Sequence, residues 1–200
     1  MDAIHTEEYK GHTIKIIPDD TFCNPRKDWD NYTTMVCFHG RYNLGDDGHG
    51  LTSDMFDGWA ELKAHIESNN DVIEMAPLYL YDHSGISIKI GSWIGHAPHA
   101  SWDSGMVGFI YVTKQQLKEV GTIDAKKLLE GDVECYDQYL RGNVYGYQVV
   151  DPDGEDGDSC WGFFGDYEEE GGCLSEARSV IDYIVEEELK RTGEQQELSI

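Results

Sequence analysis

The segment M-V-G-F-I-Y-V-T-K-Q-Q-L-K-E-V-G, residues 106–121, indicates the fold class of this chain most directly. Residues 106–112 are almost all apolar, aromatic or β-branched, which is typical of a buried central β-strand. Thr113 comes next and is a good helix N-cap, while Gly121 is a typical helix end. A strand that leads directly into a helix over residues 114–120 predicts a protein that mixes both kinds of element.

The sequence on either side adds strands and helices without a regular alternation of the two. Four further strands are predicted at residues 12–17, 33–39, 72–81 and 86–90. Pro77 indicates a bulge or an edge position in the third of them. Helical spacing predicts a helix over residues 56–66, and one or two helical turns are expected at 124–131. Tyrosine-rich and valine-rich residues 133–150 predict two aromatic strands that form a hairpin around the turn Arg141-Gly142-Asn143.

Residues 174–191 form the clearest helical pattern in the chain. Their apolar side chains fall on one stripe, made of Ala177, Val180, Ile181, Ile184, Val185 and Leu189. Together these patterns predict an α+β fold over residues 1–191, expected as a single domain, with a frayed tail at 192–200. We expect an antiparallel or mixed central sheet, a long C-terminal helix and one or two shorter helices.

The net charge excludes several classes of partner. The chain has 39 acidic and 15 basic residues in 200, which gives −24, and more than half of this excess lies after residue 150. With 40% hydrophobic residues the chain can bury a core, so it is not a disordered acidic tail. Nucleic acids and anionic membranes would repel it, whereas cations, a basic protein surface or a high-salt environment would suit it.

Other sequence signals point to a cytoplasmic protein without a known catalytic motif. Residues 1–20 do not resemble an export signal, and no apolar run approaches the roughly 20 residues of a membrane span. The five cysteines are widely spaced without a C-x-x-C pair, so we expect reduced thiols. Phosphate-binding, dinucleotide-binding, zinc-protease and serine-hydrolase motifs are absent from the sequence. These observations favour a binding protein, with an enzyme as the alternative.

Six short polar clusters follow or precede apolar runs and are candidates for chemistry. They begin at residues 28, 39, 82, 102, 136 and 158. If they meet at one end of a sheet, their carboxylates and imidazole would suit a divalent cation such as calcium, with His83 as a base. The metal set under this hypothesis is Asp82, His83, Asp103, Asp137 and Asp158. A looser histidine pair, His96 and His99 near Asp103, would suit zinc. The competing explanation is that these clusters are turns whose aspartates accept local backbone hydrogen bonds.

The same clusters resemble a family of small acidic proteins from bacteriophages and plasmids that has no assigned activity. The motifs are D-W-D-N-x-x-T-M-V-C-F-H-G-R-Y-N-L-G-D, L-Y-L-Y-D-H-S-G, W-D-S-G-M-V-G-F-I-Y-V, Y-D-Q-Y-L-R-G-N-V-Y-G-Y and D-S-C-W-G-F-F-G, in order between residues 28 and 165. The resemblance implies a phage or mobile-element context. By analogy, small acidic phage proteins that block host defence, such as DNA-mimicking antirestriction and anti-CRISPR proteins, suggest an anti-defence role.

The first functional hypothesis is therefore an inhibitor that binds a host nucleic-acid-handling enzyme through carboxylates that imitate phosphates. It needs no cofactor, and its partner is a basic protein surface, neither a nucleic acid nor a membrane. The partner-binding residues expected are Asp151, Asp153, Glu155, Asp156, Asp158, Asp166, Glu168, Glu169, Glu170, Glu186 and Glu187. Acidity that only keeps the protein in solution is the competing explanation. A metal-dependent hydrolase is the second hypothesis, and a nucleotide-binding protein that uses Arg26, Lys27 and Arg41 is the third.

Overall fold

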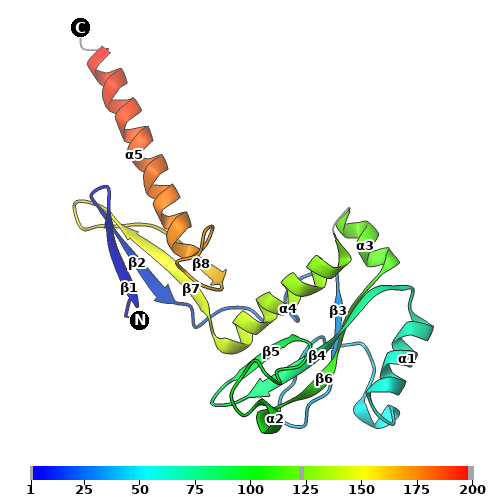
Figure 1. The fold of residues 1–200 in the computed structure, drawn as a ribbon. Helices are drawn as coiled ribbons and strands as arrows, with labels where there is room; N and C mark the ends of the chain where they lie inside the picture. The colour runs from blue at the N-terminus through cyan, green and yellow to red at the C-terminus, as the bar shows by residue number, and fades with distance from the viewer. Residues whose placement is uncertain (1, 122–123, 198–200) are drawn as a thin grey trace. The chain divides into compact units, whose positions relative to one another are not determined.

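The chain divides into two compact units, each with its own antiparallel sheet (Figure 1). The structure is a computed structural model that describes residues 2–121 and 124–197, the last of these, 192–197, by their backbone alone. Unit 1 comprises Met1–Cys23 and Asn143–Ile200, and unit 2 comprises Asn24–Gly142. The predicted α+β class is confirmed, although the expected central sheet is replaced by two four-stranded sheets. The single domain expected over residues 1–191 stays a prediction.

Unit 1 is a four-stranded sheet packed against one long helix. Its elements are β1 (His5–Tyr9), β2 (His12–Pro18), β7 (Val144–Val150), β8 (Asp156–Phe164) and α5 (Cys173–Glu197). The strand order is β1-β2-β7-β8, and every pair is antiparallel. Alternate residues of β2 and β7 point to one face, where Ile14, Ile16 and Val149 are fully buried against α5. The sequence analysis did not predict β1 or β8.

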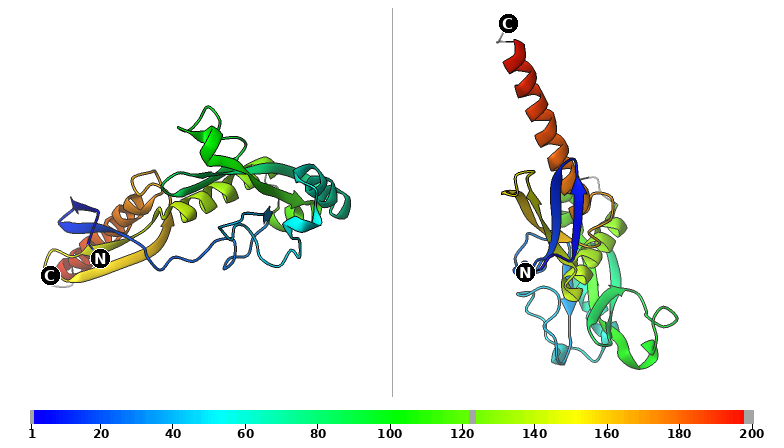
Figure 2. Two further views of the ribbon diagram at one scale, coloured as in Figure 1. Left: turned by 90° about the horizontal axis from the view of Figure 1, so that it is seen from below. Right: turned by 90° about the vertical axis from the view of Figure 1, so that its left-hand side faces the viewer.

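Among the side chains of α5 that the structure describes, those of its first half are the buried ones. Leu174, Ala177 and Ile181 are buried against the sheet, and Val185 packs beside them. Leu189 is 68% exposed, so the predicted apolar stripe is wrong at this last position. Figures 1 and 2 show why, because α5 continues beyond the ends of the strands of its own unit. Its backbone runs on to Glu197, into the segment predicted to fray, and residues 198–200 lie outside the described residues.

Unit 2 is a sheet with helices on both faces. Its strands are β3 (Thr34–Cys37), β4 (Val72–Asp82), β5 (Ile86–Ile90) and β6 (Ser104–Thr113), in the order β3-β6-β4-β5. Its helices are η1 (Ser53–Met55), α1 (Trp59–Asn69), α2 (Ala100–Asp103), α3 (Lys114–Val120) and α4 (Ala125–Arg141). The predicted central strand is β6, and Thr113 caps α3 as expected, since its hydroxyl accepts a hydrogen bond from Gln116 N at 3.3 Å.

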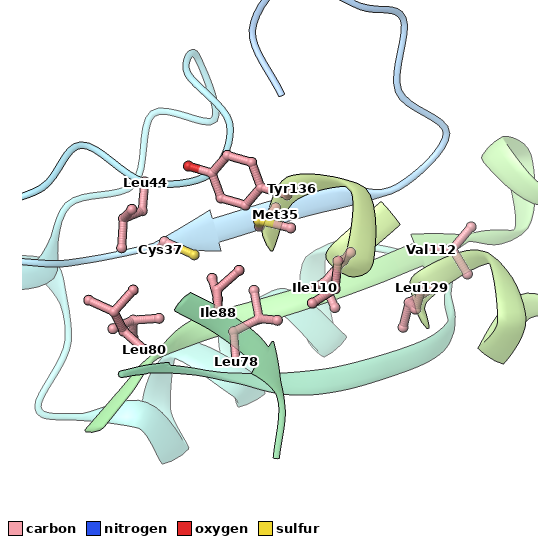
Figure 3. Packing of buried hydrophobic residues seen from close by; sticks show 12 residues of the cluster. Met35, Cys37, Leu44, Leu78, Leu80, Ile88, Ile110, Val112, Leu129 and Tyr136 are labelled. Atoms are coloured by element: carbon pink, nitrogen blue, oxygen red, sulfur yellow. The ribbon is translucent and has the colours of Figure 1, made fainter. Parts of the chain in front are cut away.

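Alternation along the strands of unit 2 gives it two cores. Met35, Ile110 and Val112 point to the face covered by α4 (Figure 3), while Phe109 and Tyr111 point to the opposite face, covered by α1. Gly108 permits the close pairing of β6 with β3, because a Cβ at this position would overlap the carbonyl oxygen of Val36. The sheet is therefore fixed from both sides, and its strand ends are held in place for the loops that follow them.

The predicted hairpin over residues 133–150 is wrong in its first strand. Residues 133–141 belong to α4 and form no strand, and Gly142 ends this helix with φ 71° while its N–H reaches Gln138 O and Tyr139 O. Leu129, Val133 and Tyr136 are spaced for a helix and bury its inner face, but tyrosine and valine favour a strand by propensity alone. The prediction for Pro77 is confirmed in its bulge alternative, because β4 shifts register between Leu78 and Tyr79, whereas β4 is an inner strand and not an edge.

All five cysteines are free, in agreement with the expected reduced thiols. Burial raises the pKa of the Cys37 and Cys173 thiols to about 12, so both pack as neutral side chains. Among the described helices, none combines the length and the apolar character needed to cross a membrane.

Candidate functional site

Two ordered acidic loops flank strand β8 in unit 1. The first, residues 151–155, turns the chain from β7 into β8, and the second, residues 166–170, connects β8 to α5. Both lie where the sequence predicts partner-binding carboxylates. The nine residues of β8 span eight steps of about 3.3 Å, so the two ends of the strand, each joined to one of the loops, lie about 26 Å apart.

Asp151 holds the first loop and does not face outward. Its Oδ1 accepts hydrogen bonds from Asp153 N at 2.9 Å and Glu155 N at 2.8 Å, and its own N–H donates to Glu155 O. Asp153, Glu155 and Asp156 are exposed around this turn. The turn therefore exposes three carboxylates on a backbone that a fourth carboxylate holds in place.

The second loop is built in the same way. The Oδ1 of Asp166 accepts a hydrogen bond from Glu168 N at 3.0 Å, and Gly172 N donates to Glu169 O at 2.9 Å. The loop folds tightly around Gly172, since a Cβ there would lie 2.8 Å from Asp166 O. Glu168, Glu169 and Glu170 are exposed on it. We call the exposed carboxylates of both loops and of β8 the acidic surface, apart from Asp166, which holds its own loop: Asp153, Glu155, Asp156, Asp158, Glu168, Glu169 and Glu170.

The few cations of unit 1 are largely neutralised by other residues of the same unit. Lys10 pairs with Asp182 at 2.8 Å, and Lys190 lies 2.9 Å from Glu186 and 3.0 Å from Glu187. Two of the predicted partner-binding residues, Glu186 and Glu187, are therefore already paired. No ion pair reaches the acidic surface from any residue that the structure describes.

Arg178 forms the best-defined ion pair of unit 1. Its Nε and Nη2 donate to the two carboxylate oxygens of Glu7, at 2.8 and 2.5 Å. This forked contact lowers the pKa of Glu7 below its ordinary value, mainly through the hydrogen bond from Arg178. The pair joins α5 to β1, and Arg178 is therefore one more basic residue of unit 1 that is paired within the unit.

In unit 2, three of the six polar clusters meet at one end of the sheet. Arg41, in the loop after β3, lies 3.2 Å from Asp82 at the end of β4, and Tyr42 Oη donates to the same carboxylate at 3.1 Å. His83 Nδ1 lies 2.9 Å from Asp103 Oδ2, which precedes β6. The sequence analysis considered that these clusters meet at strand ends. In the structure three of them do meet there, as pairs of polar side chains.

The predicted metal set does not assemble. Asp137 lies on α4 and accepts a hydrogen bond from Ile88 N at 2.7 Å, and burial raises the pKa of its carboxyl above the ordinary value. Asp158 belongs to β8 of unit 1. No group of three or more potential ligands that could hold a metal ion occurs among the side chains that the structure describes, in residues 2–121 and 124–191. The H-x-x-H pair does not form a site there either, and the ring of His99 stacks on His83.

Sequence analysis missed the strongest polar contact of unit 2. The Arg26 side chain is 1% exposed and binds both oxygens of Asp46, at 2.8 and 2.9 Å. It also donates to Asp132 on α4 at 3.2 Å, and Thr33 Oγ1 donates to the same carboxylate. Arg26 therefore fixes three segments, and it does not serve the nucleotide site for which it was considered. Its position in a polar, turn-rich segment gave no signal of this burial.

The chain was compared with known proteins. No family model, curated protein or solved structure matches it. The resemblance to phage and plasmid proteins stays a prediction.

Proposed function

We propose that this chain is a binding protein whose acidic surface occupies the nucleic-acid-binding surface of another protein. The observation that carries the proposal is the distribution of charge. Unit 1 contains five basic and 21 acidic residues, a net charge of −16, against −8 for the longer unit 2. The carboxylates of the acidic surface are exposed, and Lys10, Arg178 and Lys190 of the same unit form ion pairs elsewhere.

The amount of charge suits a basic groove that normally holds DNA. Duplex DNA carries about one negative charge per 1.7 Å, so a duplex about as long as the nine-residue β8 carries roughly 15 charges. The acidic surface places seven carboxylates along this length, within a unit whose net charge is −16. Lysines and arginines placed to bind phosphates would be attracted to such a surface over a distance of several ångströms.

The hydrogen bonds that hold the backbones of the two loops favour a binding surface over acidity that only keeps the protein in solution. Carboxylates that only keep a protein in solution need no fixed arrangement, whereas those of the acidic surface sit on loops held by Asp151 and Asp166. Pre-organised groups lose less conformational entropy when they bind. We propose a partner in the host cytoplasm, and the resemblance stated above would make it a nucleic-acid-handling defence enzyme.

The proposal is tested by capturing proteins from a bacterial lysate at low salt with immobilised wild-type chain. The test variant carries Asp153→Lys, Glu155→Lys and Asp156→Lys. The matched control carries Asp30→Lys, Asp71→Lys and Glu134→Lys, three exposed acids of unit 2, so that both variants change the net charge equally. Duplex DNA is then added to elute the bound proteins.

We expect basic nucleic-acid-binding proteins on the wild type and on the control, released by DNA, and a loss of them on the test variant. Equal capture by all three chains, or capture that DNA does not reverse, would contradict the proposal. A chain that captures no basic protein even at low salt would also contradict it.

A further inference from the structure

A pocket beside the end of β3 in unit 2 differs from the rest of this acidic protein. It has a volume of about 710 Å³, within the range of small-molecule sites. We call it the β3 pocket and define it by Phe38, His39, Arg41, Tyr42, Ser53 and Trp59. Neither an aspartate nor a glutamate lines it, although such residues make up 39 of the 200 in the chain.

His39 is fixed as a hydrogen-bond donor in this pocket. Its Nδ1 accepts from the backbone N–H groups of Arg41, at 3.3 Å, and Tyr42, at 3.2 Å. In the neutral ring the proton must then be on Nε2, because Nδ1 is the acceptor. The ring also stacks on Tyr42, with centroids 5.0 Å apart and 14° between the planes. The exposed His39 side chain therefore presents an N–H in a defined direction.

Arg41 supplies the positive charge of the pocket. Its Nη1 contacts Asp82 at 3.2 Å and Tyr42 Oη at 3.3 Å, and the guanidinium lies over the Tyr42 ring at 5.4 Å. These contacts orient the side chain, which is still 70% exposed. A guanidinium has five N–H donors in a planar fork, and Nε and Nη2 have no hydrogen bond within the described residues. An oriented fork of this kind suits a phosphate or carboxylate.

Two stacked aromatic side chains also line the pocket. The rings of Phe38 and Trp59 are stacked at 6.3 Å with 14° between their planes, and Phe56 stacks on Phe38 at 6.4 Å. A smaller cavity of about 160 Å³ continues between Phe56, Trp59 and Leu62. Aromatic faces bind planar rings by stacking, without regard to a particular hydrogen-bond pattern.

From these features we infer that the β3 pocket binds a small anion that carries a planar ring, of the class of the nucleoside monophosphates. The ring lies against Phe38 and Trp59, and the phosphate is bound by Arg41 and by the Nε2–H of His39. The lining includes a guanidinium and no carboxylate, so an anion is favoured over a cation. A free nucleotide is favoured over a nucleic-acid strand, because the net charge of −24 repels a polyanion much more than a small anion.

Isothermal titration calorimetry of the full chain with adenosine and guanosine 5′-monophosphates tests the inference. Adenosine, guanosine and inorganic phosphate are the partial ligands. A single-stranded oligonucleotide, which carries the same rings and phosphates, tests whether a nucleic-acid strand binds instead of a free nucleotide. Arg41→Gln removes the charge of the pocket, and Lys126→Gln is the matched control, since Lys126 is a 73% exposed base on α4 that does not line the pocket. Ser53→Phe fills the pocket without changing the charge.

At least one nucleotide is expected to bind with a Kd below about 1 mM, and each partial ligand about tenfold or more weakly. Arg41→Gln is expected to weaken nucleotide binding at least about tenfold, and Ser53→Phe to abolish it, whereas Lys126→Gln leaves it within about twofold. The absence of nucleotide binding to the wild type, or equal loss in Arg41→Gln and Lys126→Gln, would overturn the inference. Tighter binding of the oligonucleotide than of the mononucleotide would also overturn it. Because neither triple variant of the capture experiment changes the pocket, the two proposals can fail separately.

Discussion

Carboxylates serve opposite purposes in the two units of this chain. In unit 2, Asp46 and Asp132 turn inward onto the buried guanidinium of Arg26, and Asp137 accepts a backbone N–H. In unit 1, the acidic surface points outward on two ordered loops, and most bases of the unit are paired elsewhere. The difference teaches that the net charge of −24 is not spread evenly in function, because unit 2 turns some of its acids inward to hold its fold, whereas unit 1 presents seven of them on the acidic surface.

The largest expected effect comes from removing the buried cation of unit 2. Arg26→Met leaves Asp46 and Asp132 without their partner, and is expected to lower the free energy of unfolding by about 3–5 kcal/mol. Arg178→Met in unit 1 breaks a more exposed pair and should cost no more than about 1 kcal/mol. Urea unfolding measures both. Similar costs for the two variants would show that the inward and outward roles are not distinct.

The next effect concerns the apolar face of α5. Ile181 is fully buried against the sheet, so Ile181→Ala is expected to destabilise the protein by about 2–5 kcal/mol. Leu189→Ala, on the part of the same helix that leaves the sheet, should cost less than about 0.5 kcal/mol. Equilibrium unfolding followed by circular dichroism provides the comparison. A large loss at Leu189 would mean that a surface other than the sheet of unit 1 covers this part of α5.

A smaller effect is expected when the outward carboxylates are reversed. Asp153, Glu155 and Asp156 make no ion pair within the described residues, so their triple replacement by lysine should change the free energy of unfolding by at most about 0.5 kcal/mol per site. Asp151→Ala removes the acceptor that holds the turn, and should be more destabilising than any one of the three. Thermal unfolding of the four single variants and the triple variant gives the ranking, and a reversed ranking would contradict the account of this loop.

The smallest effect is expected in the pH dependence of the unfolding free energy, to which Glu7 and Asp137 contribute with opposite signs. The pKa of Glu7 is lowered by Arg178, so its stabilisation is complete above the ordinary pKa of glutamate and is lost as the pH falls through the lowered value. The pKa of Asp137 is raised by burial, so its contribution is complete below the ordinary pKa of aspartate and is lost as the pH rises through the raised value. Unfolding free energies between about pH 3 and 7 should show that Glu7→Gln removes the first dependence and Asp137→Asn the second. The same sign for both would refute this assignment.

Local sequence patterns predicted much of this fold because local rules govern those parts. Thr113 caps α3 and Gly121 ends it, and the apolar strands β2, β3 and β6 form where alternation or apolar runs predict them. The α4 segment was assigned wrongly because Tyr136 and Val133 favour strands locally, whereas the sheet on which they pack is formed by distant residues. Strand β8 was missed because its exposed residues, among them Asp158 and Ser159, carry no hydrophobic pattern.

The site was predictable to a lesser degree. The composition of residues 151–158 and 166–170 was enough to predict the acidic loops. Three polar clusters do converge at the strand ends of unit 2. Pairing could not be predicted from the sequence, because Glu186 and Glu187 share Lys190 as an ion-pair partner and Asp151 accepts the hydrogen bonds of its own turn. The β3 pocket depends on Phe38 and Trp59 meeting face to face, and nothing in their separate local sequences indicates that contact.

The salt dependence of binding to a captured partner tests the central claim most directly. The Kd of one such purified partner is measured between about 0.01 and 0.15 M salt, where the Debye length falls from about 30 to 8 Å. Wild type and the unit 2 control, with Asp30, Asp71 and Glu134 reversed, should show the same steep loss of affinity. The variant with Asp153, Glu155 and Asp156 reversed should bind more weakly at low salt and show a shallower dependence. If both triple variants behave alike, or if affinity does not change with salt, the acidic surface is not where the partner binds.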